Sequence, residues 1–192
     1  MAKSKGESVE IPMANVRLSY PHLWVAQRFD EANDKEGPKF SATLIFPKGG
    51  DIHEVIAAGI KRVITSMWPE GRPASLKHCL NDGATRADKD GYSADVMFIN
   101  ASSADRFTVI DRNKRPLVAS DGKPYAGCYV NAIVRLWPQD NKFGKRVNAQ
   151  PLGVQFWRDG DAFGGAGRVA SPDDFDIFDD GSTENDDDPL NL

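Results

Sequence analysis

The sequence predicts a mainly β domain, a small Greek-key barrel with one helix, followed by a disordered acidic tail at the C-terminus. Several short runs alternate between apolar and polar residues, which is the pattern of half-buried strands. One longer run, residues 51–68, spaces its apolar residues like the buried stripe of a helix. The last 22 residues hold nine acidic side chains and no lysine or arginine, a composition that does not fold alone.

Length and composition indicate one domain of ordinary size plus this tail. The chain has 192 residues, and 40% of them are hydrophobic. No apolar run approaches the roughly 20 residues of a membrane helix, and the N-terminus lacks the apolar segment of a secretory signal. Cys79 and Cys128 form no CxxC pair and are too few for a disulfide framework. We therefore expect a reduced, cytoplasmic protein without membrane contact.

The first strand is expected at residues 9–20, because Val16, Leu18 and Tyr20 alternate with polar residues. Pro21 is expected to end this strand, since proline cannot donate to a ladder of hydrogen bonds. Val16, Leu18 and Tyr20 should then share one face of a half-buried strand, with Asn15, Arg17 and Ser19 on the other face.

The same alternation predicts a second strand at residues 39–46, with its even-numbered residues inward and its odd-numbered residues outward. A turn follows, and Asp51 is a plausible N-cap for a helix that runs to about Trp68. Residues 69–92 are rich in Gly, Pro, Asn and Asp, so we expect irregular structure there.

The second half of the chain predicts strands joined by turns. The expected strands are residues 94–100, 106–110, 126–137 and 146–157. Residues 138–144 are expected to form a hairpin-type loop, and Pro151 is expected to mark a bulge or an edge position.

These elements divide the chain into a flexible N-terminus at residues 1–8, a folded domain at residues 9–170 and a disordered tail at residues 171–192. Long strands joined by turns, with a single helix crossing one end, fit a Greek-key barrel. The OB-fold is one such barrel, and it binds oligonucleotides across one face and two loops. Other β-rich α+β folds fit the same pattern.

Charge is distributed unevenly between the expected domain and its tail. The whole chain has 24 basic and 28 acidic residues, so removing the nine tail acids leaves 24 against 28 − 9 = 19, or about +5. A basic body can bind a polyanion through release of counterions. The acidic tail would repel that polyanion or compete with it for the body.

The strand at residues 126–137 gives the first candidate binding surface. Its outward face mixes aromatic, amide and guanidinium groups, namely Tyr129, Asn131, Ile133, Arg135 and Trp137. Bases stack on aromatic rings while arginine meets phosphate, so this face could be a platform for a single strand. The alternative is that the face packs on the helix or on a second subunit.

The loop after this strand adds cations and aromatic rings to the candidate DNA-binding surface. The alternative interpretation is a solvated loop that one ring anchors to the domain. Across the chain, the residues expected to stack bases are Tyr20, Tyr92, Tyr129, Trp137 and Phe143. The residues expected to bind phosphates are Arg17, Lys39, Arg106, Arg135, Lys142, Lys145 and Arg146.

No catalytic or cofactor motif is visible in the sequence. The three histidines have no metal-ligand spacing with one another or with the cysteines, and no nucleophile elbow, Walker A or HExxH motif occurs. We expect no cofactor, no metal and no enzymatic activity. A metal-dependent nuclease is the weakest alternative, because the body lacks a convincing acid cluster.

The tail ends in acids followed by apolar residues, which is typical of a docking peptide. Carboxylates would meet a basic rim on a partner, and the apolar end would enter a pocket. The residues expected to dock are Asp186, Asp187, Asp188, Leu190 and Leu192. The alternatives are a merely solubilising tail, or a virion or chaperone-like interaction module that works through the tail and has no DNA affinity.

Residues 17–24 and 39–46 resemble the opening of a phage protein family long catalogued as a domain of unknown function, and residues 153–157 and 163–165 resemble its closing motif. The resemblance spans residues 9 to about 168 and implies a single-stranded DNA-binding protein with an OB-fold, similar to that of phage T7. It also implies action in the cytoplasm of an infected bacterium.

The resemblance further implies sequence-independent binding during phage DNA replication and recombination, with a tail that recruits replication proteins such as a polymerase or a helicase-primase. The tail ends in Leu192, where such tails commonly end in an aromatic residue. The sequence leaves the oligomeric state open.

Overall fold

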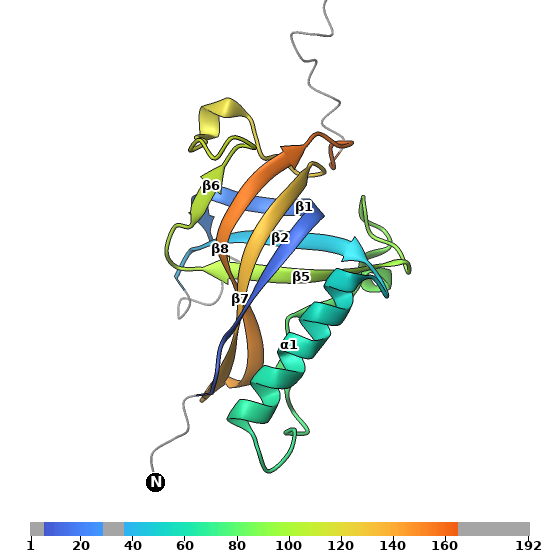
Figure 1. Ribbon diagram of the computed structural model, residues 1–192, viewed down its shortest axis with the longest axis vertical. Coiled ribbons are helices and arrows are strands. Elements are labelled where there is room, and N and C mark those ends of the chain that lie inside the picture. The colour runs from blue at the N-terminus through green and yellow to red at the C-terminus, as the bar shows by residue number, and fades with distance from the viewer. Residues whose placement is uncertain (1–5, 29–36, 165–192) are drawn as a thin grey trace, which may run out of the picture.

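The computed structural model describes residues 6–28 and 37–164 (Figure 1). The expectations for residues 1–5 and for the tail at residues 171–192 lie outside the described residues. Five long strands form a barrel, and one long helix packs on its side (Figure 1). The barrel strands are β1 (Val9–Gln27), β2 (Lys39–Pro47), β5 (Val96–Ser103), β7 (Tyr129–Asn141) and β8 (Gly144–Arg158).

The barrel closes because each of its strands pairs with two others. The order is β1–β2–β5–β8–β7, and β7 pairs with β1 again. All neighbours are antiparallel except β5 and β8, which meet in a parallel bridge between Ala101 and Ala149. A five-stranded, partly open Greek-key barrel is the OB architecture, so the predicted fold class is confirmed.

Smaller elements fill the connections between the barrel strands. They are the helix α1 (Asp51–Met67), the strands β3 (Lys77–His78), β4 (Leu80–Asp82) and β6 (Thr108–Ile110), and the 3-10 turns η1 (Gly83–Arg86) and η2 (Ala119–Asp121). β3 and β6 run parallel to β8, and β4 pairs with β5.

The core lies inside the barrel and under α1. The even-numbered residues of β7 from Val130 to Leu136 are buried, as their alternation predicts. α1 contributes Ile56, Ile60 and Val63 to the same core. It comes close to the barrel at Gly59, where an added Cβ atom would lie 2.8 Å from Ile11 Cδ1.

The first strand differs from the expectation at its C-terminal end. Pro21 does not end β1, which continues to Gln27 with register shifts after Ser19. Tyr20 has a φ of 43°, so the regular alternation is lost there. Ser19 is consequently buried, while Tyr20 is 46% exposed on the opposite face from the one expected.

The hairpin between β7 and β8 is also tighter than expected. The segment 138–144 was expected to be a loop, but Asn141 pairs with Gly144 and leaves only Lys142 and Phe143 in the turn. Pro151 does mark a bulge, because the register shifts between the Ile133–Gly153 and Val134–Pro151 pairs, as expected.

Other boundaries differ by a few residues. Gly50, not Asp51, is the N-cap of α1, and no side chain bonds to that end; Asp51 is the first helical residue. Residues 69–92, expected to be irregular, include β3, β4 and η1. The last three barrel strands begin and end within four residues of the expected positions.

Candidate nucleic-acid interface

A groove of about 1220 Å³ lies between the outer face of β2 and β5 and the β7–β8 hairpin. The segment from Lys77 to Lys89, which contains β3, β4 and η1, contributes further lining residues. In an OB-fold, oligonucleotides bind to the face of the second and third barrel strands and to the flanking loops. β2 and β5 are the second and third barrel strands here, so the groove occupies that position.

Short polar side chains form the floor of the groove. They alternate outward from β2 and β5 with the buried core residues, and the ladder places Ser41 opposite Ser102 and Thr43 opposite Asn100. The hydroxyl of Thr43 donates to Oδ1 of Asn100 at 2.9 Å. These small residues leave the space that larger outward side chains would fill.

Aromatic rings stand at the sides of this floor. Trp137 and Phe143 come from the β7–β8 hairpin, and Tyr20 comes from the irregular part of β1. Phe143 is 52% exposed because it lies in the two-residue turn. The positive φ of Tyr20 turns its ring outward, where it lies beside the guanidinium of Arg86.

The charge of the groove lining is strongly positive. Among the described lining residues, Asp105 is the only acidic one, against the cations Lys39, Lys77, Arg86, Lys89 and Arg146. The adjacent Asp88 carboxylate raises the pKa of Lys89, which therefore keeps its charge at neutral pH. A cleft lined by one sign of charge focuses the field and attracts a polyanion.

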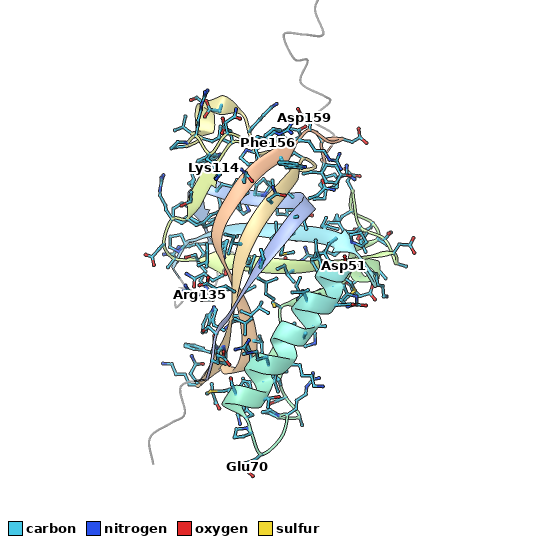
Figure 2. All side chains as sticks on the ribbon, in the orientation of Figure 1. Asp51, Glu70, Lys114, Arg135, Phe156 and Asp159 are labelled. Atoms are coloured by element: carbon cyan, nitrogen blue, oxygen red, sulfur yellow. The ribbon has the colours of Figure 1, made fainter. Side chains whose placement is uncertain are left out.

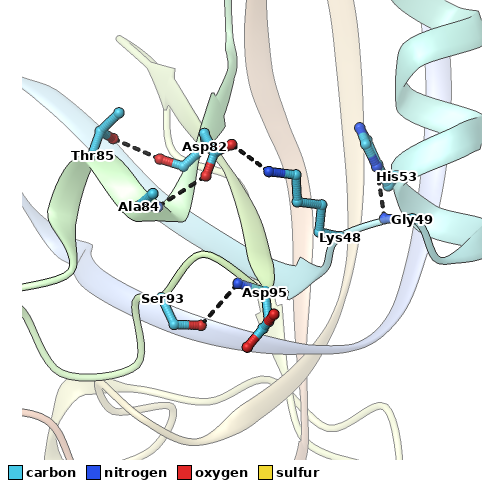
Figure 3. Close-up of polar contacts among 8 residues, drawn as sticks. All are labelled: Lys48, Gly49, His53, Asp82, Ala84, Thr85, Ser93 and Asp95. Carbon is cyan, nitrogen blue, oxygen red and sulfur yellow. Dashed lines mark hydrogen bonds and ion pairs between the residues drawn. The ribbon is translucent and has the colours of Figure 1, made fainter.

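Asp82 anchors the segment that carries several of these cations (Figure 3). Its carboxylate accepts from Lys48 Nζ at 2.6 Å and from the backbone N–H of Ala84 at 2.9 Å. The hydroxyl of Thr85 donates to the backbone carbonyl of Asp82 at 2.6 Å. The bond to Lys48 lowers the pKa of Asp82, so the anchor is ionised at neutral pH. η1 is thereby tied to the end of β2.

A family model described as the ssDNA-binding protein of Enterobacter phage Enc34 matches residues 9–190. The chain belongs to this family. Putative protein p50 of Acyrthosiphon pisum secondary endosymbiont phage 1 is 41% identical over 178 residues, which is 88% of this chain and 93% of that protein. The resemblance seen in the sequence is thus confirmed.

Solved structures support the same assignment. The single-stranded DNA-binding protein of bacteriophage Enc34, solved in complex with ssDNA, is 30% identical, with a TM-score of 0.69 over 81% of this chain and 89% of that one. The single-stranded DNA-binding protein of bacteriophage T7 is 12% identical, with a TM-score of 0.55 over 91% and 98%, a likeness of fold alone. The Enc34 family consists of DNA-binding proteins, so the expectation that the chain is not an enzyme is confirmed.

In this member of the Enc34 family, the groove brings together five of the residues predicted from sequence to contact DNA. They are Tyr20, Lys39, Trp137, Phe143 and Arg146. They come from β1, β2 and the β7–β8 hairpin, three parts of the chain that are separated in the sequence. Lys142 lies next to them in the hairpin turn, with its ammonium 5.1 Å from the centre of the Phe143 ring.

Tyr129 and Arg17 lie at the other end of β7. Tyr129 precedes Trp137 by eight residues on the same strand face, which is roughly 26 Å. Arg158 lies 3.5 Å from the centre of its ring, and Arg17 lies on the ring at 5.7 Å. Arg17 also donates to the backbone carbonyls of Gly127 and Asp161. In Figure 2, the label Asp159 shows where this end of the barrel lies, and the label Glu70 lies at the opposite end of the molecule, below α1.

Three further cations predicted to meet phosphate are engaged by the protein itself. Arg135 lies on the outer surface of the barrel (Figure 2) and pairs with Glu10 at 2.8 Å. Lys145 lies 3.9 Å from Asp140. Arg106 donates to the backbone carbonyl of Trp24 at 3.1 Å.

Tyr92 is buried in a small second core. It is 6% exposed, and its ring meets Phe98 edge-on at 5.1 Å between centroids. Arg86 covers both rings from the groove side. Because its ring is buried in this way, Tyr92 is not available to stack a base in this conformation.

The sequence analysis missed the groove residues Lys77, His78, Asn81, Arg86 and Lys89. They fall in the segment expected to be irregular, where no strand face could be assigned. The positive charges of Lys77, Arg86 and Lys89 were the signal by which these residues could have been found. The floor residues were missed for another reason, since single serines carry no pattern.

Other chemistry finds little support in the described residues. Among residues 6–28 and 37–164, no group of three His, Cys, Asp or Glu side chains could hold a metal ion. Burial raises the pKa of the Cys79 thiol to about 12 and that of Cys128 to about 11, so neither is a ready nucleophile. No helix in the described part of the chain is long and apolar enough to cross a membrane.

Proposed function

We propose that the chain binds single-stranded DNA in the groove between β2–β5 and the β7–β8 hairpin, independently of base sequence. The observation that carries this proposal is the composition of the groove: its described lining residues include five cations and three aromatic rings against one carboxylate, at the ligand-binding position of an OB-fold. The Enc34 protein in this family was solved with ssDNA bound, which supports the same ligand.

In the proposed complex, rings and cations have separate tasks. Trp137, Phe143 and Tyr20 stack on the bases, a contact that every base can make because each has a π face. Lys39 on β2 and Arg146 on β8 neutralise phosphates, together with the cations of the 77–89 segment. Because neither stacking nor phosphate contacts depend on the identity of the base, the protein binds single-stranded DNA without sequence preference.

We also propose that the acidic tail competes with DNA for the groove and, once displaced, recruits replication proteins such as a polymerase or a helicase-primase. Its nine acids and absence of basic residues complement the positive groove. The setting would be phage DNA replication or recombination in the host cytoplasm. We propose, as part of the same account, that the DNA-binding domain comprises residues 9–170 and the acidic tail residues 171–192.

The test is binding of a fluorescent oligothymidine to the full chain over a range of salt concentrations. The double variant Lys39→Ala, Arg146→Ala is compared with Arg135→Ala, Lys145→Ala, which removes the same charge outside the groove. Each phosphate contact on a single strand contributes roughly 0.7 to the log–log salt slope, so the groove variant should lose roughly 1.4. The control should stay close to the parent.

Two results would contradict the proposal. One is the absence of binding by the parent even at low salt, which would favour the interaction module that works through the tail. The other is an equal loss in both double variants, which would mean that net charge, not the groove, governs binding.

A further inference from the structure

Ser41 on the groove floor has an unusual hydroxyl. The residue is 6% exposed, and its Oγ has no hydrogen-bond partner among the described residues. Buried polar groups in native proteins are nearly always hydrogen-bonded, so an unpaired one asks for an explanation. The only other unpaired buried side-chain atom in the described chain is the Tyr92 hydroxyl, which belongs to the second core and not to the groove.

Its neighbours on the same surface are satisfied within the protein. Thr43, two residues along β2, donates to Asn100. Ser103, also buried, accepts from the backbone N–H of Asp105 at 3.1 Å and from Gln150 at 3.3 Å. The unpaired hydroxyl of Ser41 thus differs from those of its two buried neighbours Thr43 and Ser103, which line the same groove.

The position of Ser41 suits the edge of a base better than a phosphate. Ser41 lines the same groove as the rings of Trp137 and Phe143, and the floor around it carries hydroxyl and amide groups, while the cations come mostly from the surrounding segments. A base stacked on such a ring projects its hydrogen-bonding edge sideways. Ser41 Oγ is covered in the free protein, so the base must displace the atoms over it before this neutral hydroxyl can meet that edge.

Resting on the proposed function, we infer that Ser41 is a contact residue for the Watson–Crick edge of an unpaired base. A serine hydroxyl both donates and accepts, so it can serve a carbonyl, a ring nitrogen or an amino group. The contact therefore requires a base but does not discriminate among the four bases. A paired base has this edge occupied, so the same contact discriminates against duplex DNA.

The experiment compares Ser41→Ala with the parent on two probes, oligothymidine and an abasic oligonucleotide of equal length. The abasic strand keeps the phosphates and sugars but lacks the bases. Removal of one hydrogen bond should weaken oligothymidine binding about five-fold and leave the abasic affinity unchanged. Ser19→Ala is the matched control, because Ser19 is a buried serine of the same barrel outside the groove lining.

Stability provides an independent readout of the same residue. Because the Ser41 hydroxyl has no partner in the free protein, Ser41→Ala should unfold at a urea midpoint no lower than that of the parent. A lower midpoint would mean that the hydroxyl is already bonded and would overturn the inference.

Four possible binding results separate the inference from the proposed function. Unchanged oligothymidine binding by Ser41→Ala overturns the inference, and so does an equal loss on the abasic strand, which would assign the hydroxyl to the backbone. If the parent fails to bind oligothymidine at all, the proposed function itself fails. A loss confined to oligothymidine supports both.

Discussion

Trp137 and Tyr129 lie on one face of β7, but their surroundings differ. Trp137 lines the groove, and its cross-strand neighbour is Asn148. Tyr129 pairs with Arg158, whose guanidinium covers its ring, and Arg17 contacts the same ring. One ring is thus open to a ligand, while the other is part of a cation–aromatic cluster that holds the end of the barrel together.

Trp137→Ala is expected to weaken oligothymidine binding by roughly 1–3 kcal/mol, because one stacked base loses its ring. Tyr129→Ala should change the affinity less than two-fold but lower the urea midpoint, since Arg158 and Arg17 lose their shared ring. Fluorescence anisotropy and urea unfolding of both variants check this pair. Equal losses of affinity would show that the groove is not the stacking surface.

Alternation along the chain predicted which face of a strand each residue occupies, and it did so well where the strand is regular. It could not say which end of β7 borders the groove, because that depends on how the β7–β8 hairpin folds over β2 and β5. Tyr20 shows a second limit. Its positive φ reverses the expected face, and no local signal for that conformation stands out around a tyrosine.

At the scale of elements, the segment around η1 contains short strands that form by pairing with distant barrel strands and that the local sequence does not predict. β3 is two residues long and β4 is three, and both exist because they pair with β8 and β5. Runs that short carry no periodicity. The sequence accordingly indicated turns in residues 69–92, although the helix before them and the strands after them were predicted within a few residues.

Asp82→Asn should loosen this segment in a pH-dependent way. The amide still accepts from Ala84, but the ion pair with Lys48 is lost. The folded-state pKa of Asp82 is lowered, so its contribution is present at neutral pH and disappears as the pH falls through that lowered pKa. The variant should be less stable than the parent at pH 7 and converge with it below the ordinary pKa of 3.8.

Urea unfolding at several pH values measures this difference. Asp95→Asn is the matched control, because the bond that Asp95 makes with Ser93 uses its backbone N–H (Figure 3). A deficit in Asp82→Asn that persists unchanged at acidic pH would contradict the assignment to the ion pair.

For the whole molecule, the closed order of the barrel strands concentrates positive charge in one groove while the net charge of the chain is −4. The sequence predicted the barrel class and the charge asymmetry, because both follow from strand count, turn positions and composition. It could not predict the groove itself, which requires β5 and β8 to meet and thereby to align distant side chains.

Truncation after Ala170 should strengthen oligothymidine binding at low salt, because nine competing carboxylates are removed. The gain should shrink as salt rises, since screening weakens both the tail and the DNA contacts. Titrations of the full and truncated chains at two salt concentrations test this. Equal affinities at low salt would show that the tail does not occupy the groove.

The most direct test of the central claim is photo-crosslinking of an oligothymidine to the full chain, with the joined peptides mapped by mass spectrometry. Binding in the groove predicts crosslinks at Trp137, Phe143 or Tyr20, the rings that line it. Crosslinks concentrated at Tyr129 or Trp157, whose rings lie against Arg158 and Arg112, would place the DNA on the other end of the barrel and contradict the account.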